Sequence, residues 1–100
     1  MKINELKDGM NNIDVEGMMT GAIGNSRIVQ LKSGTSARVR DIWFDDDTGR
    51  IKLSLWNEQV DLLTIGQKAT IKGGYVNTFR GELQLNVGKF GKLIPGKAPD

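Results

Sequence analysis

The segment from Ile51 to Trp56 constrains the fold of this chain more than any other stretch of its sequence. Apolar and polar side chains alternate along it, which is the pattern of a β-strand with one face in a core and the other in water. The last position breaks the alternation, because Trp56 falls on the polar face with Lys52 and Ser54. A large aromatic ring on a face that should be wet indicates a surface that binds a partner.

A preceding strand is predicted over residues 37–44, just before a turn of three aspartates, a threonine and a glycine. Pairing Phe44 with Ile51 across this turn makes a hairpin in which Trp43 lies opposite Lys52. Trp43 is therefore expected on the same outward face as the tryptophan that ends the next strand.

Shorter apolar patterns and glycines indicate the other elements. They are a helical turn (4–10), a strand (12–23), a short helix after the hairpin (57–65) and two more strands (67–75 and 82–87). Alternation in the last strand places Leu83 and Leu85 inward and Gln84 and Asn86 outward.

The remaining segments are expected to be irregular. Residues 25–36 and 77–81 read as loops, and the polar, glycine-containing end from Gly88 onward reads as loosely held. This predicts one domain over residues 1–93 and a loosely ordered C-terminal tail over residues 94–100.

Five short strands with a helix between the third and the fourth predict an all-β fold, a small barrel in the order of the OB-fold. The first predicted strand contains Gly17, Gly21 and Gly24. Glycines within a strand mark bulges, which allow a sheet to coil and close.

Composition excludes several classes of function. The chain has 100 residues, enough for one domain, and contains neither cysteine nor histidine. It therefore lacks the commonest metal ligand and general base, as well as any thiolate, so we expect a protein that is not an enzyme and holds no metal or cofactor. No apolar run is long enough to span a membrane and no signal peptide is evident at the start, so a cytoplasmic location without membrane contact is expected.

Charge is distributed unevenly along the chain. Residues 1–50 hold seven Lys/Arg against eight Asp/Glu, whereas residues 51–100 hold seven against four. Two more aromatic residues, Tyr75 and Phe79, lie in this basic half within a glycine-rich stretch. Exposed aromatic rings among basic side chains are what stacking on single-stranded bases and holding their phosphates requires. The candidate phosphate ligands are Lys52, Lys72, Arg80 and Arg40, and Arg27 and Lys32 in the expected loop 25–36 are further candidates to clamp a strand from the other side.

Two motifs resemble a known family. Residues 47–56 (DTGRIKLSLW) and 74–88 (GYVNTFRGELQLNVG), together with the opening 6–10 (LKDGM), are similar to the single-OB-fold single-stranded DNA-binding proteins of archaea. The OB domains of replication protein A are related to them. The resemblance covers roughly residues 3–93.

This resemblance implies base stacking on Trp56, Tyr75 and Phe79, and a role in DNA replication, repair or recombination. Some relatives carry a further aromatic residue in the fifth strand, where this chain has Asn86. Trp43 stands where relatives often have a smaller or charged residue, and we count it as a fourth candidate for stacking.

Two other functions stay open at this point. A stacking platform does not distinguish RNA from DNA, because that distinction rests on contacts with the 2′-hydroxyl. Exposed aromatic residues are also enriched at protein interfaces, so the chain could be an interaction subunit of a replication or repair complex.

Overall fold

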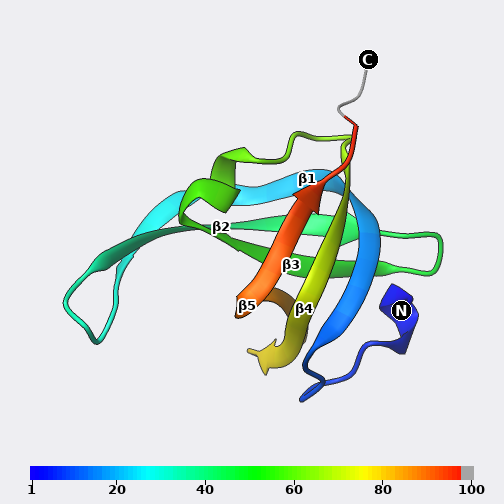
Figure 1. Cartoon of the computed structure of the whole chain (residues 1–100), viewed down its shortest axis with the longest axis horizontal. Helices are drawn as coiled ribbons and strands as arrows, with labels where there is room; N and C mark the ends of the chain where they lie inside the picture. The colour runs from blue at the N-terminus through cyan, green and yellow to red at the C-terminus, as the bar shows by residue number, and fades with distance from the viewer. Residues whose placement is uncertain (98–100) are drawn as a thin grey trace.

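Five strands close into a barrel in the order β1-β2-β3-β5-β4 (Figure 1). The computed structural model describes residues 1–97, with the side chains of Lys89 and Phe90 excepted. All neighbouring strands are antiparallel except β3 and β5, which are parallel. The elements are η1 (Ile3–Glu5), β1 (Ile13–Gln30), β2 (Ser36–Asp45), β3 (Arg50–Trp56), η2 (Asn57–Asp61), β4 (Lys68–Phe79) and β5 (Glu82–Pro95). The predicted all-β barrel with a short helix between the third and fourth strands is confirmed, and this helix is of the 3-10 type.

The β2–β3 hairpin has the register expected from its sequence. Phe44 pairs with Ile51 and Trp43 pairs with Lys52. The N–H of Asp46 donates to the carbonyl oxygen of Gly49 at 3.0 Å and closes the turn. The outward positions of these two strands therefore form one continuous face.

Strand β1 is longer than predicted and reaches beyond the barrel. Its last residues, Arg27–Gln30, pair with the start of β2, so most of the expected loop 25–36 is a two-stranded ribbon (Figure 1). The chain turns within residues 31–35, where Gly34 has a positive φ angle of 88°. The register shifts between Met19 and Gly21 and again between Ile23 and Arg27, as the glycines in this strand predicted.

Strands β4 and β5 are also longer than predicted, so the expected loop 77–81 is wrong. They join through Arg80 and Gly81, both with positive φ angles of 52° and 81°, in a tight two-residue turn. Strand β5 then continues to Pro95, which pairs with Ala69. The expectation of a loosely held end from Gly88 is therefore wrong for the residues up to Pro95, and positions 98–100 lie outside the described residues.

The inward faces of the strands meet in an aliphatic core around Phe44. Leu85 is fully buried as expected, whereas Leu83 is 38% exposed, because it lies next to the turn where β5 begins. In residues 1–97 no helix is long and apolar enough to cross a membrane. The buried core consists of Ile3, Leu6, Ile13, Val15, Met19, Ile42, Phe44, Ile51, Leu53, Leu55, Val60, Leu63, Ala69, Ile71, Val76 and Leu85.

Candidate functional site

Strand register brings outward-facing residues of β3, β5 and β4 into rows across the barrel. One row runs through Ser54 on β3, Asn86 on β5 and Tyr75 on β4. The adjacent row contains Lys52 on β3, which pairs with Gln84 on β5. Residues far apart in the sequence thus share one face because the strands alternate and pair in this register.

Three aromatic side chains line a single open hollow on this face, which we call the aromatic groove. Trp56 is half-buried, Tyr75 is 40% exposed and Phe79 is 56% exposed. The alternation in β3 therefore correctly predicted an accessible indole ring. The groove has a volume of about 280 Å³ and is lined by Arg27, Val29, Val39, Asp41, Lys52, Ser54, Trp56, Tyr75, Asn77, Phe79, Gln84 and Asn86.

Hydrogen bonds fix a polar floor in the groove. Ser54, only 2% exposed, donates from Oγ to Asp41 Oδ1 at 2.8 Å and accepts a bond from Gln84 Nε2. Asn86, 5% exposed, donates from Nδ2 to Asn77 Oδ1 at 3.0 Å. Because these buried polar groups have partners, they hold the floor in one arrangement beneath the rings.

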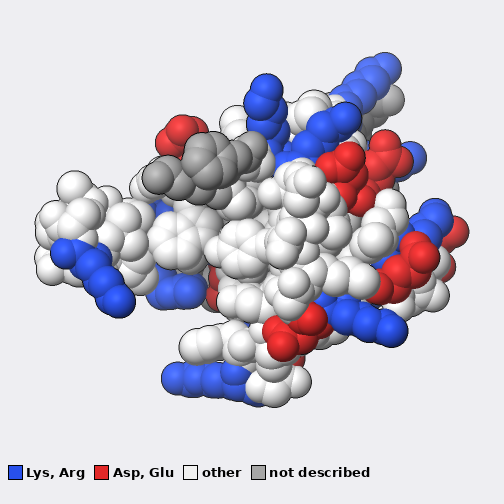
Figure 2. Space-filling view, turned by 60° about the horizontal axis from the view of Figure 1, so that its bottom comes forward, with Lys and Arg blue, Asp and Glu red and all other residues white. Residues whose placement is uncertain are grey.

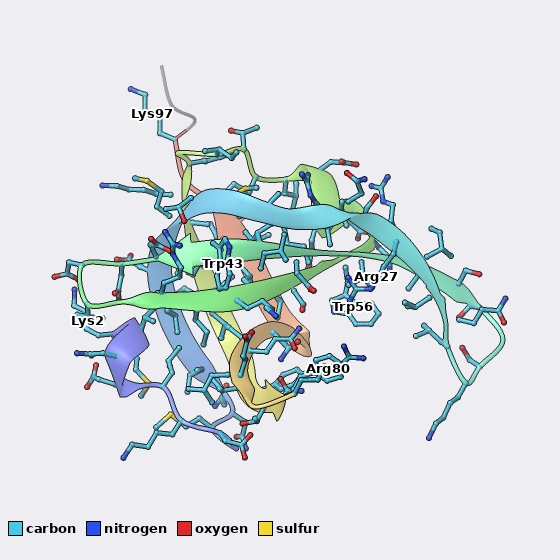
Figure 3. The ribbon with its side chains drawn as sticks, turned by 180° about the vertical axis from the view of Figure 1, so that it is seen from behind. Lys2, Arg27, Trp43, Trp56, Arg80 and Lys97 are labelled. Carbon is cyan, nitrogen blue, oxygen red and sulfur yellow. The ribbon has the colours of Figure 1, made fainter. Side chains whose placement is uncertain are left out.

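Positive charge lies beside the aromatic rings. Arg27 projects from the β1–β2 ribbon next to Trp56 (Figure 3), and its Nη1 lies 3.4 Å from a carboxylate oxygen of Asp41. Arg80, in the β4–β5 turn, has its guanidinium carbon 5.3 Å from the ring centre of Phe79. In the view of Figure 2, uncharged surface occupies the middle of the molecule, and both basic and acidic side chains lie around it.

Lys52 lies in the groove but is already paired. Its Nζ is 3.0 Å from Glu82 Oε2, and its side chain is only 21% exposed. Any phosphate that it binds must compete with this carboxylate.

Of the four proposed phosphate ligands, Lys52 lines the groove and Arg80 lies beside the ring of Phe79, but Arg40 and Lys72 lie elsewhere. Arg40 pairs with Leu55 and alternates with Asp41, so it lies on the side of β2 that carries Ile42. Lys72 faces outward but lies in the other half of β4 and lines a separate hollow near the N-terminus. Arg40 was wrongly expected on the outward face of its strand. Lys72 does face outward, as expected, but it lies in a different part of β4 from the aromatic residues.

Asn77 and Gln84 were not predicted as site residues. Gln84 follows the same outward alternation as Trp56, which was the signal that could have found it. Asn77 was read as part of the loop 77–81, so no alternation was available for it. Arg27 was considered as a residue that clamps a strand from the expected loop 25–36, and the structure places it on a ribbon instead.

Trp43 faces outward as predicted but lies in a neighbouring hollow. This second hollow, which we call the Trp43 hollow, has a volume of about 250 Å³. It is lined by Ile3, Trp43, Arg50, Ile51, Lys52, Glu82 and Leu83. Lys52 is therefore common to the two hollows.

A structured acidic turn lies at the end of the β2–β3 hairpin. Burial opposes ionisation of Asp46, but hydrogen bonds from Thr48 Oγ1 and from the N–H groups of Ile3, Thr48 and Gly49 outweigh it and lower the pKa of Asp46 to about 2. A larger hollow of about 600 Å³ adjoins this turn, away from the aromatic groove. Within the described part of the chain no group of three or more acidic side chains is arranged to hold a metal ion.

Comparison with known proteins identifies the family. The family described as "Single-stranded DNA binding protein Ssb-like, OB fold" matches residues 11–95. The chain belongs to this Ssb-like OB-fold family. The resemblance inferred from residues 47–56 and 74–88 is thereby confirmed. The family is one of binding proteins, which also confirms the expectation that the chain is not an enzyme.

Individual relatives agree with this assignment. The Ssb-like domain is 30% identical over 92 residues to the single-stranded DNA binding protein Ssb of Saccharolobus solfataricus, covering 92% of this chain and 61% of that protein. It is 31% identical to the replication factor A of Methanothermobacter thermautotrophicus, covering 99% of this chain but 13% of that protein. The chain thus spans only part of the length of these two relatives.

A solved structure gives the same fold. The second OB-fold domain of replication protein A from Methanococcus maripaludis superposes on the Ssb-like domain with a TM-score of 0.78 and 26% sequence identity. The match covers 100% of this chain and 98% of that domain. The predicted OB-fold is therefore confirmed.

Proposed function

We propose that this Ssb-like domain binds single-stranded DNA in the aromatic groove, without chemistry. The observation that carries the proposal is that Trp56, Tyr75 and Phe79 line one open hollow on a rigid barrel face. Each base stacked on such a ring contributes ~1–3 kcal/mol of binding free energy, and every base offers a flat face. Binding should therefore be strong for single strands and only weakly dependent on sequence.

Basic side chains around the groove supply the phosphate contacts. Arg27 and Lys52 line it, and Arg80 stands beside the ring of Phe79. Neutralising phosphates releases counterions, so the affinity should fall as the salt concentration rises. Because Lys52 is held by Glu82 and Arg27 contacts Asp41, part of this positive charge is used within the protein.

The polar floor adds a modest capacity to contact base edges. The amides of Asn77, Gln84 and Asn86 line the same groove as the rings, and amide groups offer both donors and acceptors. Contacts with these amides would make the affinity differ modestly from base to base, while stacking on the rings supplies most of the binding free energy.

The biological role that we propose is in DNA replication, repair or recombination, with other replication or repair proteins as partners. The name of the relative from Methanothermobacter thermautotrophicus, replication factor A, supports replication. RNA is the alternative ligand of the same groove and is tested together with DNA.

A titration against single-stranded DNA, RNA and duplex DNA of one sequence, each at two salt concentrations, tests the proposal. We expect single-stranded DNA to bind, to lose affinity at the higher salt concentration and to exceed the duplex by a wide margin, since duplex bases are already stacked. Equal binding of the duplex would reject stacking. Failure to bind any nucleic acid at low salt would favour a protein interface instead. Tighter binding of RNA than DNA would reassign the ligand.

A further inference from the structure

The Trp43 hollow has the chemistry of a second site for a nucleic acid base. Trp43 is half-buried and displays its indole ring on the outward face of β2. The guanidinium carbon of Arg50 lies 5.5 Å from the centre of this ring. Indole rings and planar guanidinium groups both stack on bases, so this pair forms a ready platform for one planar group.

The Trp43 hollow continues directly from the aromatic groove. Trp43 pairs with Lys52 on β3, and Lys52 pairs with Gln84 on β5, so this row of residues leads from one hollow into the other. Trp56 stands four residues beyond Lys52 on β3, which corresponds to ~13 Å along a strand. A stacked single strand covers this distance in about four nucleotides, and an extended one in fewer.

Ion pairs offset part of the negative charge of the acidic turn at this end of the face. Asp45 is paired with Arg50 at 3.0 Å, and Asp47 is paired with Lys2 at 2.8 Å, which reduces the repulsion of phosphate by these two carboxylates. Asp46 accepts hydrogen bonds from the N–H groups of Ile3, Thr48 and Gly49 and keeps its negative charge.

We propose that Trp43 and Arg50 form a second base-stacking site, which a single strand reaches only after filling the aromatic groove. This inference rests on the proposed function, because the same strand must occupy both hollows. The protein then has two binding modes that depend on oligonucleotide length. Short oligonucleotides fill the groove alone, whereas longer ones pass over Lys52 and also stack on Trp43.

The two tryptophans of the chain allow each site to be observed separately. Trp56→Phe leaves Trp43 as the only indole, and Trp43→Phe leaves Trp56, while each change keeps an aromatic ring in place. We titrate both variants with oligo-dT of about four and about twelve nucleotides, lengths within the range of site sizes for one OB-fold. The emission of Trp56 should be quenched by both oligonucleotides, and that of Trp43 only by the longer one.

Affinity provides a second, independent measurement. Trp43→Leu keeps an apolar side chain but removes the ring. The control is Leu62→Ala, because the side chain of Leu62 is exposed and lies outside both hollows. Trp43→Leu should weaken binding of the longer oligonucleotide about five-fold or more and leave that of the shorter one unchanged. Circular dichroism establishes that the variants are folded.

The outcomes separate the two proposals. Emission from Trp43 that stays constant at saturation with the longer oligonucleotide overturns the second site while leaving the groove intact. Equal loss of affinity for both lengths in Trp43→Leu also overturns it, because Trp43 would then act on the groove itself. If neither tryptophan responds and neither oligonucleotide binds, the proposed function itself fails.

Discussion

Lys52 shows how a single side chain can set the strength of a binding face. It lies at the junction of the aromatic groove and the Trp43 hollow, and it forms an ion pair with Glu82. Glu82 is largely exposed, so this pair contributes little to stability, but it removes one positive charge from any incoming phosphate.

Replacing Glu82 with Gln should therefore strengthen binding of single-stranded DNA. We expect an increase of about two- to five-fold at low salt and a steeper dependence of affinity on salt, because Lys52 becomes free to displace a counterion. Glu58→Gln makes the same change of charge on exposed η2 and should have a smaller effect. Equal effects of the two variants would mean that the change in net charge alone raises the affinity, and that the ion pair of Lys52 with Glu82 does not limit it.

Asp46 makes stability depend on pH. Its pKa is lowered in the folded protein to about 2, below the ordinary value of 3.8, so folding favours the ionised form. The stabilisation is complete above the ordinary pKa and is lost as the pH falls through about 2.

We expect the free energy of unfolding to decrease between about pH 4 and pH 2, and Asp46→Asn to flatten this slope. The variant should also be less stable than the native chain at neutral pH, because the amide is a weaker acceptor for the N–H groups of Ile3, Thr48 and Gly49. Urea unfolding across this pH range measures both effects, with Asp8→Asn, an exposed carboxylate, as the control. An unchanged slope in Asp46→Asn would show that other groups carry the acid sensitivity.

At the scale of elements, sequence reasoning succeeded where side-chain alternation was strong. The hairpin of residues 37–56 has the predicted register because Phe44 and Ile51 both need the core. It failed where pairing between strands, not local pattern, decides the structure. Residues 88–95 are rich in glycine and lysine and look irregular, yet β4 supplies a partner strand that holds them in the sheet.

The close packing of β4 against the second half of β5 depends on small residues. A Cβ atom added at Gly91 would lie 2.7 Å from the carbonyl oxygen of Lys72 and 2.8 Å from that of Gly73. These are backbone atoms, so they cannot move aside as a flexible side chain would.

Gly91→Ala should therefore destabilise the domain by about 1–3 kcal/mol, the usual cost of forcing an extra group into a packed region. Gly49→Ala is the matched control, since its added Cβ would meet only a side-chain carbon of Ile3 at an ordinary 3.8 Å. Chemical denaturation of the two variants compares them directly. Equal stability of Gly91→Ala and the native chain would mean that β4 and β5 leave room for a methyl group at this position.

At the scale of the whole molecule, the aromatic groove is a product of the barrel and of no single segment. Its three rings come from β3 and β4, its polar floor mainly from β2, β3 and β5, and Arg27 from the ribbon that extends β1. The rings could be predicted from sequence, because Trp56 breaks the alternation of β3 and the other two rings lie in a glycine-rich, basic stretch. Alternation also indicated that Ser54, Gln84 and Asn86 face outward, but their contacts with Asp41 and Asn77 depend on long-range register. Arg27 was considered only as a loop residue, because its place in the groove depends on the pairing of β1 with β2.

If Trp56 is a stacking platform on a fold that does not need its ring, the affinity of Trp56→Ala for oligo-dT is the decisive measurement. We expect a folded variant that binds ~1–3 kcal/mol more weakly than the native chain, with its denaturation curve measured alongside. Native affinity in a folded Trp56→Ala protein would contradict the stacking role, and loss of the folded state would show that the ring belongs to the core.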